Sequence, residues 1–161
     1  MISIPKWITI IYIVLLSTVL GASIYAGAVV APTIFNSEIY LGSELLTHYQ
    51  EGLLMTQNFI KLSYMVDIVI LAVIFYEGYR FKSFERDSIA LLSGVLVVLS
   101  GLLFSFYYMP QILEFQAKGE EITKSKIFEN THFASELDFK LFSIALLVLI
   151  VRNLYRSIKG S

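Results

Sequence analysis

The sequence predicts an all-α integral membrane protein, a four-helix bundle in which residues 1–161 form a single membrane domain. Residues 7–37 contain no Lys, Arg, Asp, Glu or His, and residues 88–113 form a second such run. A helix needs about 20 apolar residues to cross a hydrocarbon core of about 30 Å, and both runs are longer than that. The chain is also 57% hydrophobic and only 16% charged. It shows neither the alternating pattern nor the turn spacing of a membrane β-barrel, so helices are expected.

Four membrane spans are expected, at about residues 7–36, 59–79, 88–113 and 137–156. The first and third are the charge-free runs. The second contains two acidic residues, and the fourth has charged residues near both ends. The uncharged part of the fourth is short, so Lys140 and Arg152 are expected to extend their charged tips toward the interface. The outer connections are then expected at about residues 37–58 and 114–136.

The basic residues predict that both termini are cytoplasmic. Membrane proteins keep Lys and Arg near helix ends on the cytoplasmic side. Seven such residues fall on one side of the four spans: Lys6, Arg80, Lys82, Arg86, Arg152, Arg156 and Lys159. The first outer connection has no Lys or Arg but has three Glu, and residues 114–138 have three Lys against six acidic residues. A multi-pass protein of the bacterial inner (cytoplasmic) membrane is therefore expected.

Several classes of protein are disfavoured by what the sequence lacks. The chain has no Cys, which removes disulfides and thiolate metal sites. It has no glycine-rich phosphate loop, no Gly-x-Ser-x-Gly elbow and no His-Glu-x-x-His motif, so the sequence favours a protein that is not an enzyme. Its only basic cluster is a short inner connection, and nucleic acid is not expected as a partner. The expected partners are the lipid bilayer and a homo-oligomer or larger membrane complex.

Two Glu/His stripes in the outer connections predict a metal site. Each of the two histidines lies between two Glu at spacings of three and four, which share a face of a helix. The two sets are Glu44, His48 and Glu51, and Glu129, His132 and Glu136. Imidazole and carboxylate groups suit a divalent transition metal such as Zn, Cu, Fe or Mn. The alternative interpretation is that these residues are solvated helix ends at the membrane surface.

Asp67 lies near the middle of the second expected span. An unpaired carboxylate costs at least about 2.5 kcal/mol there, so its side chain is expected to face the interior. It either marks a pathway for an ion or proton, or it is protonated and bonded to a hydroxyl such as that of Ser17, Ser100 or Ser105.

Small residues and prolines indicate how the expected helices pack and where they bend. Ser17 and Gly21 lie four apart in the first span, and Gly94 and Gly101 lie on one side of the third. Such spacing permits close helix packing within the bundle or against a second protomer. Two prolines near the outer ends of these spans, Pro32 and Pro110, are expected to bend or end their helices.

Three parts of the sequence resemble a known family. They are the segment Ala26-Gly27-Ala28-Val29-Val30-Ala31-Pro32-Thr33-Ile34-Phe35, the proline at 110, and the run Phe128-x3-His132-x2-Ser135. Together they resemble the small four-span family related to transmembrane protein 205, whose bacterial members form a domain family of unknown function. The resemblance implies a four-helix membrane protein without a settled activity. The resemblance also suggests metal handling as a function, but only by analogy with the family.

Three hypotheses for function follow. The favoured one is a membrane protein whose extracytoplasmic face binds a divalent metal, for handling or transport. The second is a structural or assembly subunit of a membrane complex. The third is a membrane redox or lipid-related enzyme that uses Asp67 or the tyrosines.

Overall fold

The computed structural model describes residues 4–83 and 87–159, and these form helices without a strand. The described residues make four long helical segments. The first is α1 (Lys6–Tyr25) with η1 (Ala26–Val30) and α2 (Ala31–Phe35), and the second is α4 (His48–Lys82). The third is α5 (Ser88–Leu103) with η2 (Phe104–Tyr108) and α6 (Met109–Ala117), and the fourth is α8 (Lys126–Lys159). Two short helices, α3 (Ser37–Leu41) and α7 (Glu120–Thr123), lie in the outer connections.

Three of these segments are long and apolar enough to span a membrane. Within the described residues they are Lys6–Phe35, His48–Lys82 and Ser88–Ala117. The expectation of a membrane protein is therefore supported. The fourth segment, α8, has 34 residues but is not among the three. The helices are also longer than the expected spans, since α4 begins at His48 rather than near residue 59.

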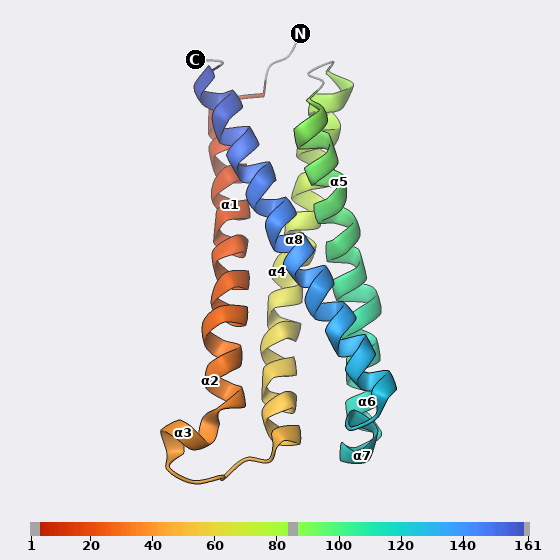
Figure 1. Ribbon diagram of the computed structural model, residues 1–161. Coiled ribbons are helices and arrows are strands. Elements are labelled where there is room, and N and C mark those ends of the chain that lie inside the picture. The colour runs from red at the N-terminus through yellow and green to blue at the C-terminus, as the bar shows by residue number, and fades with distance from the viewer. Residues whose placement is uncertain (1–3, 84–86, 160–161) are drawn as a thin grey trace.

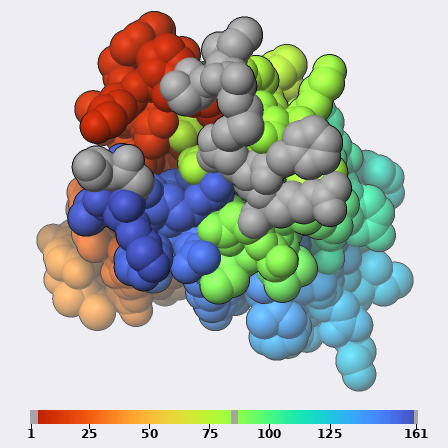
Figure 2. Space-filling view, turned by 90° about the horizontal axis from the view of Figure 1, so that it is seen from above, coloured from red at the N-terminus to blue at the C-terminus, as the bar shows by residue number. Residues whose placement is uncertain are grey.

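The four long segments form a ring. Both α1 and α5 pack against α4 and α8, and α8 crosses the bundle obliquely (Figure 1). The start of α1, the end of α4, the start of α5 and the end of α8 lie at one end of the bundle, and α3 and α7 lie at the other (Figure 1). Seen along the bundle, α8 lies beside both α1 and α5 (Figure 2). We refer to these two ends as the basic end, which carries Lys6 and Lys159, and the outer end.

The two halves of the chain repeat one design. The buried positions of the first segment are Tyr12, Leu16, Val19, Ser23 and Ala26, and the buried positions 78 residues later are Ala90, Gly94, Val97, Gly101 and Phe104. The buried positions Leu62, Val66, Val69, Ile70, Val73 and Glu77 of α4 match Asp138, Phe142, Ala145, Leu146, Leu149 and Asn153 of α8, 76 residues later. Exchanging α1 with α5 and α4 with α8 preserves the ring of contacts. The chain thus consists of two helical hairpins that share one pattern of buried positions.

The two prolines occupy equivalent places in this repeat. Pro32 and Pro110 each follow a π-helical turn, η1 or η2. In each turn a backbone N–H bonds to the carbonyl five residues earlier, from Ala31 to Ala26 and from Met109 to Phe104. Both helices continue beyond the proline, to Phe35 and to Ala117, so of the two expected outcomes, a bend or an end, the helix does not end at the proline itself. The wider π-helical turn comes just before the proline, which has no N–H to donate. The regular backbone hydrogen bonds of the α-helix resume after the proline.

The small residues of α5 pack within the chain. A Cβ atom placed on Gly101 would lie 2.8 Å from Ile70 Cδ1 and 3.1 Å from Val66 Cγ1 on α4. One on Gly94 would lie 3.4 Å from Val73 Cγ1. Glycine therefore lets α4 and α5 approach closely. By contrast, nothing lies within 4 Å of a Cβ atom placed on Gly21 of α1, which faces outward.

Candidate functional site

The outer end of α4 holds three of the six predicted metal ligands. A capping box starts this helix, because the Thr47 side chain accepts from the Gln50 N–H and the Gln50 side chain accepts from the Thr47 N–H. The box places His48 and Glu51 on the first turn. Nδ1 of His48 lies 3.4 Å from Oε2 of Glu51.

Glu51 is fixed, whereas His48 is open to solvent. Glu51 is 4% exposed, and its Oε1 accepts a 2.6 Å hydrogen bond from the Ser37 hydroxyl on α3. The side chain of His48 is 86% exposed, and the centroid of its ring lies 5.4 Å from the centroid of the Phe35 ring. A held carboxylate therefore lies beside an accessible imidazole.

An acidic pocket of about 400 Å³ surrounds this pair. Its lining residues are Phe35, Glu38, Glu44, Leu46, His48 and Glu51. Glu38 was not among the predicted ligands. It comes from α3, which the fold brings back against the start of α4. The ionisable groups of the lining are three carboxylates and one imidazole, an arrangement that favours a cationic ligand.

The other three predicted ligands lie apart from this pocket. Glu129, His132 and Glu136 belong to α8 and do not line it. Oε1 of Glu136 accepts a 2.7 Å hydrogen bond from Lys140 Nζ. In the part of the chain that the structure describes, no three His, Asp or Glu side chains lie close enough together to hold one metal ion. The structure thus does not join the two stripes into one preformed site.

Asp67 lies within α4, and its Oδ1 atom is buried without a hydrogen-bond partner. The Ser105 hydroxyl is also buried and has no partner. Ser105, one of the three hydroxyls considered as a partner, therefore does not bond to Asp67 Oδ1, and the role of Asp67 stays a prediction.

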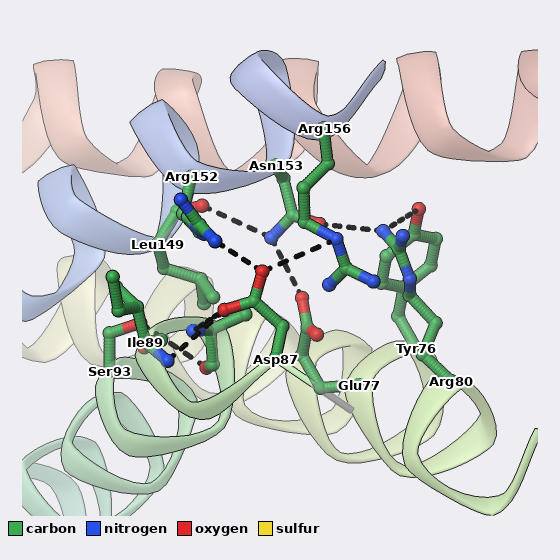
Figure 3. Close-up of polar contacts among 11 residues, drawn as sticks. Tyr76, Glu77, Arg80, Asp87, Ile89, Ser93, Leu149, Arg152, Asn153 and Arg156 are labelled. Atoms are coloured by element: carbon green, nitrogen blue, oxygen red, sulfur yellow. Dashed lines mark hydrogen bonds and ion pairs between the residues drawn. The ribbon is translucent and has the colours of Figure 1, made fainter. Parts of the chain in front are cut away.

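A polar cluster at the basic end joins the helices of both halves (Figure 3). Oε1 of Glu77 on α4 accepts hydrogen bonds from Asn153 Nδ2 of α8 at 2.8 Å and from the Tyr12 hydroxyl of α1 at 3.2 Å. Oδ1 of Asn153 accepts from Arg80 Nη1 at 3.0 Å. Asn153 is fully buried and Glu77 is 8% exposed. Buried polar groups joined in this way hold the helices in one register.

Asp87 connects the start of α5 to α8 in the same cluster. Its Oδ1 caps α5 by accepting from the N–H groups of Ile89 and Ala90, and its Oδ2 lies 2.8 Å from Arg152 Nε and 3.4 Å from Arg156 Nε. Burial favours the neutral acid, but the bond from the Ala90 N–H and the two guanidinium groups outweigh it. The pKa of Asp87 is therefore lower than usual.

The polar cluster contains equivalent positions of the two halves. Glu77 and Asn153 are equivalent positions 76 residues apart, and they bond to each other. Thr9, which bonds to the Tyr76 hydroxyl at 2.8 Å, is the counterpart of Asp87, which bonds to Arg152. Sequence analysis missed this cluster. A buried amide cannot be told from an interfacial one by sequence, although the matching spacing of polar positions in the two halves is a signal for it.

Comparison with known proteins identifies the family. A model of the family described as a domain of unknown function (DUF4149) matches residues 14–121, more than half of the chain. The chain belongs to the DUF4149 family. No curated protein and no solved structure matches it. The DUF4149 match covers the outer pocket, Asp67, Glu77 and Asp87, and it ends before α8. The relationship to transmembrane protein 205 stays a prediction.

Proposed function

We propose that this DUF4149 protein is a four-span inner-membrane protein, with cytoplasmic termini, that binds a divalent cation at the outer end of α4. Three spans are supported by length and hydropathy. The fourth, α8, is proposed because it packs beside α1 and α5 over the depth of the bundle and has an uncharged stretch at residues 141–151. The orientation is proposed because every Arg of the described residues lies at the end where α1 begins and α8 ends, whereas Lys118, Lys124 and Lys126 of the outer end lie among acidic residues.

One observation supports cation binding, namely the acidic pocket at the outer end. Its lining includes Glu38, Glu44, His48 and Glu51, without Lys or Arg. Metal ligands of this kind lie about 2 Å from the ion. His48 Nδ1 and Glu51 Oε2, 3.4 Å apart, are therefore close enough to share one ion. Glu44 and Glu38 add negative charge from the wall, and water completes the coordination.

Metal analysis of the purified full-length protein tests this proposal. We expect about one Zn²⁺ or Mn²⁺ ion per chain after equilibration and desalting. His48→Ala is expected to weaken binding by about 10-fold or more, because it removes the nitrogen ligand. His132→Ala is the matched control, since it removes the other histidine, and is expected to bind as the parent does. Absence of bound metal, or equal binding by the His48→Ala protein, would refute the proposal.

A second candidate function, an assembly subunit, is favoured by the outward face of α1. Ser17 and Gly21 lie one turn apart on this face and are exposed. Because the chain has no Cys, a Ser17→Cys variant carries a single thiol. If the chain assembles with itself through this face, the Ser17→Cys variant forms a disulfide-linked dimer in native membranes. Adding Gly21→Leu is then expected to lower the yield of that dimer. A Leu147→Cys variant on the exposed face of α8 is the control. Equal cross-linking of both thiols would count against a specific interface.

A further inference from the structure

We propose that Asp138 is a proton-binding site inside the bundle and that its carboxyl group holds a proton in the resting protein. Asp138 lies on α8 and is only 9% exposed. Its Oδ2 atom is buried and has no hydrogen-bond partner. The proposal does not depend on the outer cation pocket, which involves different residues and a different helix.

The surroundings of Asp138 disfavour a negative charge. Burial is the dominant influence on the carboxyl group, and it outweighs the hydrogen bond from the Ser100 hydroxyl of α5, which by itself favours the charged form. Tyr108 on η2 is a titratable side chain that faces the carboxyl group from a neighbouring element. Phe139 and Phe142 adjoin it on α8. In residues 4–83 and 87–159, no Lys, Arg or His of α1, α4, α5, α6, α7 or α8 forms an ion pair with it. An ionised carboxylate with a free oxygen in such an interior is more costly than the neutral acid.

Lys140, two positions further along α8, does not supply the missing charge. Its Nζ donates to Oε1 of Glu136 at 2.7 Å, and both side chains are more than half exposed. Lys140 and Glu136 therefore compensate each other in solvent, and Asp138 is left with neutral neighbours.

The internal repeat shows that packing does not require an acid at this position. The equivalent residue 76 positions earlier is Leu62, which is 5% exposed. An apolar side chain therefore fills the same place in the first half. Unlike Glu77 and Asn153, which are equivalent polar residues bonded to each other, Asp138 has an apolar counterpart. Asp138 has one carboxyl oxygen without a partner and no ion-pair partner among the described residues. An ionisable residue in this state inside a membrane bundle points to a functional role.

Labelling with dicyclohexylcarbodiimide tests the proposal on the full-length protein in detergent micelles. This apolar reagent adds to a protonated carboxyl group. The carboxyl proton moves to one reagent nitrogen, the carboxyl oxygen bonds to the central carbon, and the acyl group then migrates to nitrogen. The stable product therefore gains one whole reagent. We expect the adduct on the peptide that contains Asp138, with a yield that falls as the pH is raised and the carboxyl group loses its proton.

Two variants and one ion make the result decisive. Asp138→Asn is expected to lose this adduct and Asp67→Asn to keep it. If the asparagine variant fails to fold, Asp138→Leu serves instead, because Leu62 shows that leucine fits. A protonated-acid carbonyl band in the infrared spectrum is expected to vanish in the same variant. No adduct on Asp138 in the folded protein, an adduct independent of pH, or protection by Na⁺ at constant pH would each overturn the assignment to a proton.

Discussion

Asn153 is the residue that most clearly holds the helices together through hydrogen bonds. Its amide donates to Glu77 and to the Leu149 carbonyl, and it accepts from Arg80. Because the side chain is fully buried, water cannot replace these bonds. Asn153 therefore links α8 to α4 through buried hydrogen bonds to Glu77 and Arg80.

Replacement of Asn153 by Leu is expected to destabilise the protein by about 1–3 kcal/mol, because Glu77 and Arg80 each lose a buried partner. Thermal unfolding in detergent, followed by circular dichroism, measures the effect as a lower Tm. Asn130→Leu, at an exposed position on the same helix, is the matched control and is expected to change the Tm little. Equal Tm values for both variants would contradict a structural role of the polar cluster.

The lowered pKa of Asp87 predicts a pH-dependent contribution to stability. The folded-state pKa lies below that of the unfolded chain, so the stabilisation is fully present above about pH 4 and is lost as the pH falls through the folded pKa. Asp87→Asn is therefore expected to lower the Tm at neutral pH and to differ less from the parent in acid. Glu129→Gln, on the exposed start of α8, is the control. A Tm difference that stays constant with pH would argue against this ion-pair contribution.

At the scale of the helices, glycine at position 101 of α5 allows close packing against α4. The Cβ atom of an alanine at 101 would approach Ile70 Cδ1 and Cγ1 to within 3 Å, so side chains of α4 have to move. The same substitution at Gly21 meets no atom within 4 Å. A substitution at Gly101 therefore tests the packing of α4 against α5, whereas the same substitution at Gly21 tests only helix propensity.

Gly101→Ala is expected to lower the Tm, with overpacking of about 1–3 kcal/mol exceeding the gain in helix propensity. Gly21→Ala is expected to raise the Tm slightly, since Ala is favoured over Gly in a helix by about 1 kcal/mol. Both are measured by thermal unfolding in the same detergent. An increase in Tm for Gly101→Ala would show that α4 and α5 are not in close contact.

At the scale of the whole molecule, the arrangement of charge sets the expected topology. Single cysteines introduced into the Cys-free chain report it by labelling with an impermeant maleimide in intact cells. Ser43→Cys, in the outer connection, is expected to react from outside. Lys159→Cys, at the end of α8, is expected to react only after the membrane is permeabilised. Outside labelling of Lys159→Cys would exclude α8 as a fourth span with a cytoplasmic C-terminus.

Part of the fold and of the candidate site follows directly from sequence. The two charge-free runs predict α1 and α5, and the largely apolar segment around Asp67 predicts part of α4, because the hydrophobic requirement of a membrane span acts on each helix separately. The spacing of His48 and Glu51 correctly places them side by side, since one helical turn fixes their separation. By contrast, the prediction that the two Glu/His stripes form one metal site does not follow from sequence. Whether the stripes come together depends on how helices far apart in the chain cross.

By itself, the sequence determined that this is a helical membrane protein of low charge, that all of its Arg lie near the same ends of the expected spans, and that His48 and Glu51 share a turn. These properties depend on composition and on spacing within one helix. Only the tertiary structure decided that Glu38 joins the outer pocket, that Glu77 meets Asn153, and that Asp138 occupies the position equivalent to Leu62. Such relations depend on the rotation and crossing of helices far apart in the chain, which local periodicity leaves free.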